Sequence, residues 1–184
     1  MKHLILFFSA AVFLLFTESA VSAQQIVYAD ASAFPLYGKV SEDTDGRYER
    51  LPSHLKTVSR EPVWYLGRNS AGLYIRFRSN STSIHLRWES MFNNSMTHMT
   101  DTGTKGLDLY ALQDGEWRHV CSAQPQGKKS ERAVIRYMDP IEREYMLYLS
   151  LYDGISSLEI GVDEGASLDM PAVDSPSSER PVVM

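Results

Sequence analysis

The sequence predicts an all-β protein, a two-layer antiparallel β-sandwich of jelly-roll type with little helix. From Val63 onward, short β-prone runs follow one another, separated by turn residues, and no long segment has apolar residues at helical spacing. Roughly eight such runs in about 110 residues are typical of a sandwich or jelly roll. The 184 residues, 43% hydrophobic and 22% charged, have the proportions of one globular domain.

The first two strands are expected at residues 73–78 and 83–88. Both segments alternate apolar and polar side chains, so each strand has one face toward water and one toward the core. The connection Ser79-Asn80-Ser81 is short and polar. These features predict that the two strands form a hairpin.

A second hairpin is expected between residues 107 and 121. Its turn is Asp114-Gly115, which separates strands at 108–112 and 117–121. Asp-Gly tolerates the positive φ angles of a type I′ turn, and this makes the hairpin the clearest one in the chain.

Three further strands are expected after residue 130. Residues 133–138 form one, and residues 145–152 form another that is apolar on both faces. A strand covered on both sides is expected to lie centrally between layers. Asp153-Gly154 then turns the chain, and residues 158–162 return it.

Residues 1–23 have the pattern of a secretory signal peptide. A short positive start at Lys2 precedes the apolar run 4–16, and small residues lead to a cleavage point after about Ala23. The apolar run is too short for a comfortable membrane span, and no second one follows. We therefore expect a secreted or periplasmic protein with no membrane attachment after the signal is cleaved.

The mature chain divides into three parts. Residues 24–62 carry weak strand signals and are expected to wrap the sandwich or pair at an edge, and residues 63–168 form the sandwich itself. Residues 169–184 have the composition of a linker, with prolines and serines, and end in the β-branched run 181–184. That run predicts the first strand of a further domain.

Charge argues against nucleic acid as a partner. Lys and Arg total 18 against 23 for Asp and Glu, so the net charge is −5 and no basic surplus can neutralise phosphates. Cys121 is the only cysteine, so the fold depends on packing without an internal disulfide.

No cofactor or metal site is expected. The four histidines of the mature chain are widely separated, and none pairs with another at ligand spacing. The acidic segment 42–46 resembles part of a calcium loop, but with Gly46 at the sixth position the twelfth is Pro52, where a bidentate Glu is required. A solvated acidic loop is the better interpretation, although a looser calcium site stays open.

The chain also lacks a recognisable catalytic motif. No Gly-x-Ser-x-Gly sequence occurs, and Asp174-Ser175 lies in a proline-rich linker without the flanking strand and helix that a nucleophilic serine needs. Glu116 and His119 are three residues apart, so on a strand their side chains point to opposite faces. We therefore assign no catalytic residue.

The segment 94–110 resembles the signature of the GxDLY domain, with Gly106, Asp108, Leu109 and Tyr110 as its named positions. Further similarity at 115–118 and 143–162 extends the resemblance over most of residues 63–168. The resemblance implies a β-sandwich N-terminal to an SGNH (GDSL-type) hydrolase domain in secreted bacterial esterases, many of which act on polysaccharides. It also implies that a C-terminal SGNH hydrolase domain is the partner, and that Met184 stands just before its nucleophile block.

The segment between Trp88 and Lys105 is the candidate functional surface. It is longer than a hairpin needs, and long loops on a rigid scaffold commonly carry binding function. Its candidate domain-contact or substrate residues are Asn94, Met96, His98, Met99 and Asp101. The alternative is that its apolar residues only cap the core. Asp108 is expected to point away from the core and to accept hydrogen bonds from backbone amides.

Three functions remain open. The first is a non-catalytic N-terminal domain of a secreted SGNH-type hydrolase, a carbohydrate esterase, that supports or shapes the substrate cleft of the catalytic domain. The second is a stand-alone glycan-binding module, in which aromatic rings stack on sugars. The aromatic candidates are Tyr145, Tyr148, Tyr152, Trp64, Trp88 and Trp117. The third is a small hydrolase that uses His98 with Asp101 or Asp108.

Overall fold

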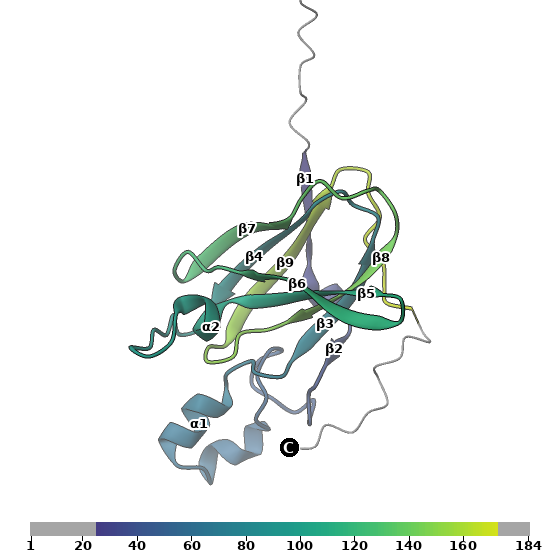
Figure 1. The fold of residues 1–184 in the computed structure, drawn as a ribbon. Coiled ribbons are helices and arrows are strands. Elements are labelled where there is room, and N and C mark those ends of the chain that lie inside the picture. Colours follow the sequence, from purple (N-terminus) through teal and green to yellow (C-terminus); the bar gives the residue numbers. More distant parts are fainter. Residues whose placement is uncertain (1–24, 173–184) are drawn as a thin grey trace, which may run out of the picture.

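The computed structural model describes residues 25–172, which form two packed β-sheets (Figure 1). The expected signal peptide, the Asp174-Ser175 pair and the expected strand at 181–184 lie outside the described residues.

The two sheets are antiparallel throughout. Sheet A has the order β1-β9-β4-β7, with β1 Ile26–Asp30, β9 Ile155–Asp163, β4 Ile84–Ser90 and β7 Lys129–Ile135. Sheet B has the order β2-β3-β8-β5-β6, with β2 Leu36–Tyr37, β3 Tyr74–Ser79, β8 Arg143–Tyr148, β5 Leu107–Gln113 and β6 Glu116–Ala123. The chain repeatedly crosses between the sheets, as in a jelly roll, so the predicted fold class is confirmed.

Helix is a minor component, as predicted. The described helices are η1 Ala31–Ala33, η2 Ser53–Thr57, α1 Glu61–Gly67 and α2 Asp101–Lys105. In Figure 1, α1 lies beyond one end of the sandwich. The sequence analysis missed α1, whose start has Glu61 in the first turn and Pro62 at a position that tolerates a missing backbone N–H.

The core lies between the two sheets. Sheet B contributes Ile75, Phe77, Leu107, Leu109, Tyr145 and Leu147, and sheet A contributes Ile84, Leu86, Trp88, Leu158, Ile160 and Val162. All of these side chains are buried. Each fully buried aliphatic or aromatic side chain stabilises the fold by about 1.5–3 kcal/mol relative to exposure. This layer fixes which side chains of sheet B face outward.

The predicted hairpin between the first two strands is wrong, because β3 belongs to sheet B and β4 to sheet A. Both strands bury one face, and a period of two cannot tell whether two strands pair side by side or face each other across a core. After β8 the chain turns at Asp153-Gly154, as predicted, and returns as β9 in the other sheet.

The polar connection between β3 and β4 is instead organised by Asp163. Its carboxylate accepts hydrogen bonds from the backbone N–H groups and hydroxyls of Thr82 and Ser83, at 2.6–3.1 Å. The Asp163 backbone N–H donates to Ser81 Oγ at 2.9 Å. Burial alone would raise the pKa of Asp163, but the hydrogen bonds from Ser83, Thr82 and Ser81 together lower the pKa below its ordinary value. This network therefore ties the two sheets together at one end of the core.

The predicted hairpin around Asp114-Gly115 is confirmed. β5 and β6 pair directly, and the two turn residues have φ angles of 53° and 79°. Positive φ at both central residues is the requirement of a type I′ turn. This hairpin forms one edge of sheet B.

Two later strands differ from the prediction. β7 covers 129–135 and not 133–138, so it begins earlier and ends at Ile135. β8 is central within sheet B, between β3 and β5, but it does not lie between two layers. Its outward residues Glu144 and Met146 are nevertheless buried. A buried outer face on β8 is the first sign of an unusual surface.

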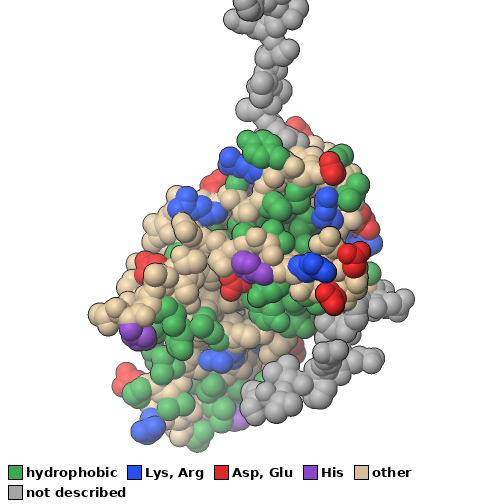
Figure 2. Space-filling view, viewed as in Figure 1, with side chains coloured by type: hydrophobic (Ala, Val, Ile, Leu, Met, Phe, Trp, Pro, Cys, Tyr) green, Lys and Arg blue, Asp and Glu red, His purple; other side chains and the backbone are tan. Residues whose placement is uncertain are grey.

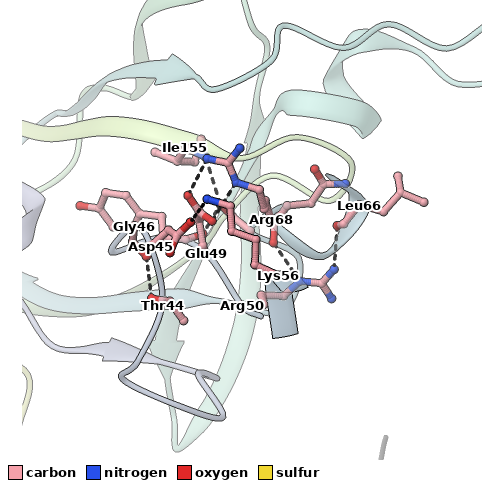
Figure 3. A network of polar contacts seen from close by, with 12 residues as sticks. Thr44, Asp45, Gly46, Glu49, Arg50, Lys56, Leu66, Arg68 and Ile155 are labelled. Atoms are coloured by element: carbon pink, nitrogen blue, oxygen red, sulfur yellow. Dashed lines mark hydrogen bonds and ion pairs between the residues drawn. The ribbon is translucent and has the colours of Figure 1, made fainter. Parts of the chain in front are cut away.

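The segment between β2 and β3 is fixed by a polar network (Figure 3). The Arg68 guanidinium donates to both oxygens of the buried Glu49 carboxylate, at 2.9 and 3.0 Å. Lys56 pairs with Asp45 at 3.2 Å, and Arg50 donates to the Asn69 carbonyl. The carboxylate of Asp45 in the acidic loop thus pairs with a cation of the same segment.

Candidate functional site

The outer face of sheet B carries one aromatic ring from each of its five strands. We call Tyr37, Tyr74, Tyr148, Tyr110 and His119 the aromatic row; they lie on β2, β3, β8, β5 and β6 respectively. Successive ring centroids are 5.2, 5.0, 5.6 and 5.3 Å apart. These spacings are those of interacting aromatic pairs. The row therefore crosses the whole sheet on the side away from the core.

A buried ion pair lies beside the aromatic row. The Arg76 guanidinium of β3 donates to the Glu144 carboxylate of β8, with Nε at 2.8 Å from Oε1, and both side chains are buried. The guanidinium also lies over the rings of Tyr37 and Trp117, at 5.6 and 5.4 Å from their centroids. Burial of a charged pair on an outer sheet face indicates that this face is not an ordinary solvated surface.

Trp117 adds an unpaired donor to the same face. Its indole Nε1 is buried and has no hydrogen-bond partner among residues 25–172. A buried unpaired N–H is uncommon in folded proteins, because it forfeits the hydrogen bond that water would supply. The unpaired indole therefore adds to the unusual character of this face.

The GxDLY residues lie at one end of this face, over a hollow of about 470 Å³. The walls come from Gly72, shortly before β3, from α2 and its flanking residues, from β5 and β6, and from the end of β8 and the residues after it. The lining residues are Gly72, Thr100, Thr102, Gly103, Gly106, Asp108, Tyr110, Ser122, Tyr148, Leu149 and Leu151. Its volume falls in the range of about 300–1,000 Å³ typical of small-molecule sites.

Gly106 is required by close packing and not by an unusual backbone angle. It follows α2, and its N–H donates to the Thr102 carbonyl at 3.0 Å. A Cβ at this position would lie 2.3 Å from the Thr102 carbonyl oxygen and 2.8 Å from that of Ala123. Only glycine lets α2 end against the β5–β6 pair, so the first position of the motif shapes the hollow.

The other motif positions divide between the core and the hollow. Leu109 is buried in the core, whereas Asp108 and Tyr110 point outward. The expected hydrogen bonds from backbone amides to Asp108 are not found among the described residues. Instead, Ser122 Oγ of the paired strand donates to Asp108 Oδ1 at 2.5 Å. His119 Nε2 lies 3.3 Å from the same Ser122 oxygen.

This arrangement differs from a serine-hydrolase triad. In a triad the histidine lies between serine and carboxylate, so that it can take the serine proton and be oriented by the acid. Here Ser122 lies between Asp108 and His119. The cluster therefore has the hydrogen-bonding groups of a binding site without the order that general-base catalysis by histidine requires.

The candidate loop is fixed to the sandwich at several points. The buried Asp153 carboxylate accepts from the Asn94 backbone N–H at 2.7 Å, and Asn94 Nδ2 donates to the Tyr152 carbonyl. The Lys105 side chain is buried and reaches Asp101 at 3.2 Å. These contacts make the loop a rigid extension of the sandwich, next to the hollow.

The remaining loop residues lie at its tip. Met96 and Met99 form a bridge with a two-residue turn between them, and His98 is exposed in that turn. The carboxylate of Asp101 is occupied by Ser95 and Lys105, and hydrogen bonds to these two groups lower its pKa. In the described part of the chain, no hydrogen bond or ion pair joins His98 to either Asp101 or Asp108.

The six aromatic candidates divide between core and surface. Tyr145 and Trp88 are buried in the core, so they cannot stack on a ligand. Tyr148 and Trp117 lie on the outer face of sheet B. Trp64 lies on α1 and Tyr152 is exposed beyond β8, away from the aromatic row. Sequence reasoning missed Tyr37, Tyr74 and Ser122. Alternation with core residues places them on the outer face, but only the order of strands in sheet B shows that they lie together.

Metal ligands are not grouped. Within residues 25–172, no three His, Cys, Asp or Glu side chains are placed to hold a metal ion. Cys121 is half-buried in β6, and burial raises the pKa of its thiol to about 11, so the thiol stays protonated at neutral pH.

No helix in the described chain is long and apolar enough to cross a membrane.

The end of the described chain returns to sheet B. Asp169 pairs with Arg78 of β3 through two backbone hydrogen bonds, at 2.8 and 2.9 Å. The Ala172 N–H then approaches Glu144 Oε2 at 3.4 Å. In Figure 1 the yellow end of the chain accordingly runs beside β8. On the face turned to the viewer in Figure 2, hydrophobic side chains gather in patches separated by other polar surface, and Lys and Arg are scattered and form no continuous patch.

Fold and site together define a jelly-roll β-sandwich module whose aromatic outer face bears a sequence motif. The chain belongs to the GxDLY family, described as "N-terminus of Esterase_SGNH_hydro-type", which matches residues 26–168. The resemblance drawn from the motif residues is therefore confirmed.

Solved structures similar to this chain include a lipase-like protein and an acyltransferase. A GDSL-like lipase from Bacteroides ovatus ATCC 8483 is 34% identical with a TM-score of 0.76, over 80% of this chain and 44% of that one. The salicylyl-acyltransferase SsfX3 from a tetracycline biosynthetic pathway shares the fold, with 19% identity and a TM-score of 0.55, over 82% of this chain and 42% of that one. The chain thus spans less than half the length of either protein. No curated protein matches the sequence.

Proposed function

We propose that this chain is the non-catalytic N-terminal domain of a secreted SGNH-type hydrolase, a carbohydrate esterase. It supports a C-terminal catalytic domain and forms part of its substrate cleft through the outer face of sheet B. Membership of a family found at the N-terminus of such esterases supports a C-terminal hydrolase partner. Export through the signal at residues 1–23 is part of the same proposal.

The observation that carries the proposal is the position of the chain's last described residues. Asp169 pairs with β3, and Ala172 lies against Glu144 on the outer face of sheet B. The described chain therefore ends next to the outer face of sheet B, which favours this face as the contact surface of a following domain. The unpaired Trp117 indole and the buried Arg76 lie on that face as well.

The candidate loop fits the same contact. Thr100 and Thr102, which lead into and lie within α2, line the hollow together with Asp108 of β5. A partner resting on the aromatic row would therefore also reach the rigid loop at residues 94–101.

An esterase assay tests the proposal. Hydrolysis of p-nitrophenyl acetate is measured for this chain alone, for the SGNH hydrolase domain alone, and for the two together. We expect no turnover by this chain, and a higher rate for the hydrolase domain when this chain is present. Turnover by this chain that disappears in His98→Ala would contradict the proposal and favour the small hydrolase. A hydrolase rate that this chain leaves unchanged would contradict the supporting role.

A further inference from the structure

We propose that the hollow over Gly106–Tyr110 is a subsite for one sugar ring of a hydroxyl-rich substrate. This inference rests on the proposed function, because it makes the hollow the contribution of this domain to the substrate cleft. It names a ligand class and a set of contacting residues that the family description does not give.

The hollow offers hydrogen-bonding groups that the protein leaves available. Asp108 Oδ1 accepts from Ser122, while Asp108 Oδ2 has no protein partner in the part of the chain that is described. The hydroxyls of Thr100 and Thr102 likewise make no side-chain bond to residues 25–172. A carboxylate has about four lone-pair positions, so it can accept hydrogen bonds from two neighbouring hydroxyls of a ligand.

One wall of the hollow is aromatic. Tyr148 and Tyr110 meet edge to face, with centroids 5.6 Å apart, and Tyr74 supports Tyr148 from the other side at 5.0 Å. Burial raises the pKa of Tyr148, so its phenol remains a hydrogen-bond donor at neutral pH. Such a wall packs against the apolar C–H face of a ring while the phenol groups reach its hydroxyls.

The residues that line the hollow also exclude other ligand classes. No Lys or Arg lines it, and Asp108 gives it a negative charge, so phosphates and carboxylates are disfavoured. The lining combines apolar groups, such as Leu149 and Leu151, with the polar side chains of Thr100, Thr102, Asp108 and Ser122, so an all-apolar acyl chain would leave these polar groups without partners. A neutral ring with many hydroxyls and one apolar face satisfies both the polar groups and the tyrosines.

Paired strands and a helix hold the residues that line the hollow, which favours binding of a small ligand. Asp108, Tyr110, Ser122 and Tyr148 lie on paired strands of sheet B, and α2 is held by the buried Lys105. Side chains fixed in this way lose little conformational entropy when a ligand binds.

A nuclear magnetic resonance titration tests the subsite. The ¹⁵N-labelled mature chain is titrated with cellotetraose, xylotetraose and chitotetraose, and with sorbitol as an open-chain polyol. We expect saturable shifts of the Gly106, Asp108 and Ser122 amides with at least one tetrasaccharide, with a Kd on the order of 1 mM. Sorbitol should leave these amides unchanged, because it has no ring face to stack on Tyr148.

A matched pair of variants locates the binding. Asp108→Asn should weaken the Kd by about tenfold or more, since a hydrogen bond to a charged group is lost. Glu131→Gln, the same change on the outer face of sheet A, should leave the Kd unchanged. The dispersion of amide signals shows whether each variant is folded.

The possible outcomes separate the subsite from the supporting role. If all three sugars leave these amides unmoved, or if sorbitol shifts them equally, the subsite is wrong, and the esterase assay still decides the supporting role. If sugar binds but this chain has no effect on the hydrolase domain, the subsite stands and the supporting role fails. An equal effect of Asp108→Asn and Glu131→Gln on sugar binding would place the contact elsewhere and overturn the subsite.

Discussion

The outer faces of the two sheets differ in how they place their charged groups. On sheet A, Arg87 donates to both oxygens of Glu131, at 2.9 and 3.3 Å, and lies 3.5 Å from the centroid of the Tyr28 ring. The Tyr28 hydroxyl donates to Glu131 as well, and burial together with this hydrogen bond raises its pKa to about 12. These groups satisfy one another and remain accessible to water.

Sheet B instead places its charged pair under aromatic rings. Arg76 and Glu144 are buried, the aromatic row crosses the face, and the Trp117 indole has no partner among the described residues. Within one sandwich, the charged groups on the outer face of sheet A pair with one another in contact with water. The outer face of sheet B instead buries its charged pair and is suited to a partner. The end of the described chain lies on the second face.

The largest expected effect is on the buried pair of sheet B. Arg76→Ala leaves the Glu144 carboxylate buried without its guanidinium partner, and should lower the free energy of unfolding by about 3–5 kcal/mol. The double variant Arg76→Met, Glu144→Leu should recover most of that loss, because no charge is then left alone. Urea denaturation followed by tryptophan fluorescence measures both. A loss below about 1 kcal/mol for Arg76→Ala would show that the ion pair of sheet B stabilises the fold no more than an exposed one does.

The next largest effect on the free energy of unfolding is expected at Asp163, which ties the two sheets together, and this effect depends on pH. Asp163→Asn should lower the free energy of unfolding by about 2–3 kcal/mol at pH 7, because hydrogen bonds to a buried carboxylate are lost. The folded state lowers the pKa of Asp163, so its contribution is complete well above the ordinary value of 3.8 and is lost as the pH falls through and below 3.8. The difference between wild type and variant should therefore shrink below pH 4 in denaturation curves. A difference that stays constant from pH 7 to pH 3 would contradict this assignment.

Gly106 tests whether close packing shapes the end of the aromatic face. Gly106→Ala should lower the free energy of unfolding by about 1–3 kcal/mol, since its Cβ would meet two backbone oxygens. Gly103→Ala is the matched control, because a Cβ there meets only the flexible Met99 side chain at 3.0 Å and alanine favours the helix. Thermal unfolding of the two variants compares them. Equal melting temperatures would show that the motif glycine is not held by packing.

The smallest effect is expected on sheet A. Arg87→Ala removes an exposed ion pair and a cation–π contact, and should lower the free energy of unfolding by less than any of the variants above, because exposed charges are screened by water. The loss should decrease in about 1 M salt, where exposed charges are screened. A loss as large as that of Arg76→Ala, measured by the same urea denaturation, would remove the contrast between the faces.

The sequence predicted the fold class and the motif, but only part of the arrangement. Alternation located most strands and the Asp114-Gly115 turn, because these signals are local. It could not assign β3 and β4 to different sheets, since the same pattern arises from strands that pair and from strands that face each other. Ser79-Asn80-Ser81 was interpreted as a hairpin turn because the buried partner of this connection, Asp163, lies about 80 residues away.

The candidate site was predicted in the same incomplete way. Asp108 and Tyr110 could be singled out because they belong to a contiguous motif. Tyr37, Tyr148 and Ser122 could not be joined to them from sequence, because each lies on a different strand and only the register brings them together. The loop at residues 94–101 directly precedes the motif in the sequence, but its attachment through Asp153 depends on a contact about 60 residues apart.

The most direct test of the account is a hydroxyl-radical footprint of the tyrosines with and without the SGNH hydrolase domain. Oxidation is measured at Tyr37, Tyr74, Tyr110 and Tyr148 of the aromatic row, and at Tyr28 on the outer face of sheet A as the internal control. The account predicts that the catalytic domain lowers oxidation of the row several-fold and leaves Tyr28 unchanged. Protection of Tyr28 without protection of the row would contradict the assignment of the sheet B face to the partner, and so would a row that is oxidised equally in both samples.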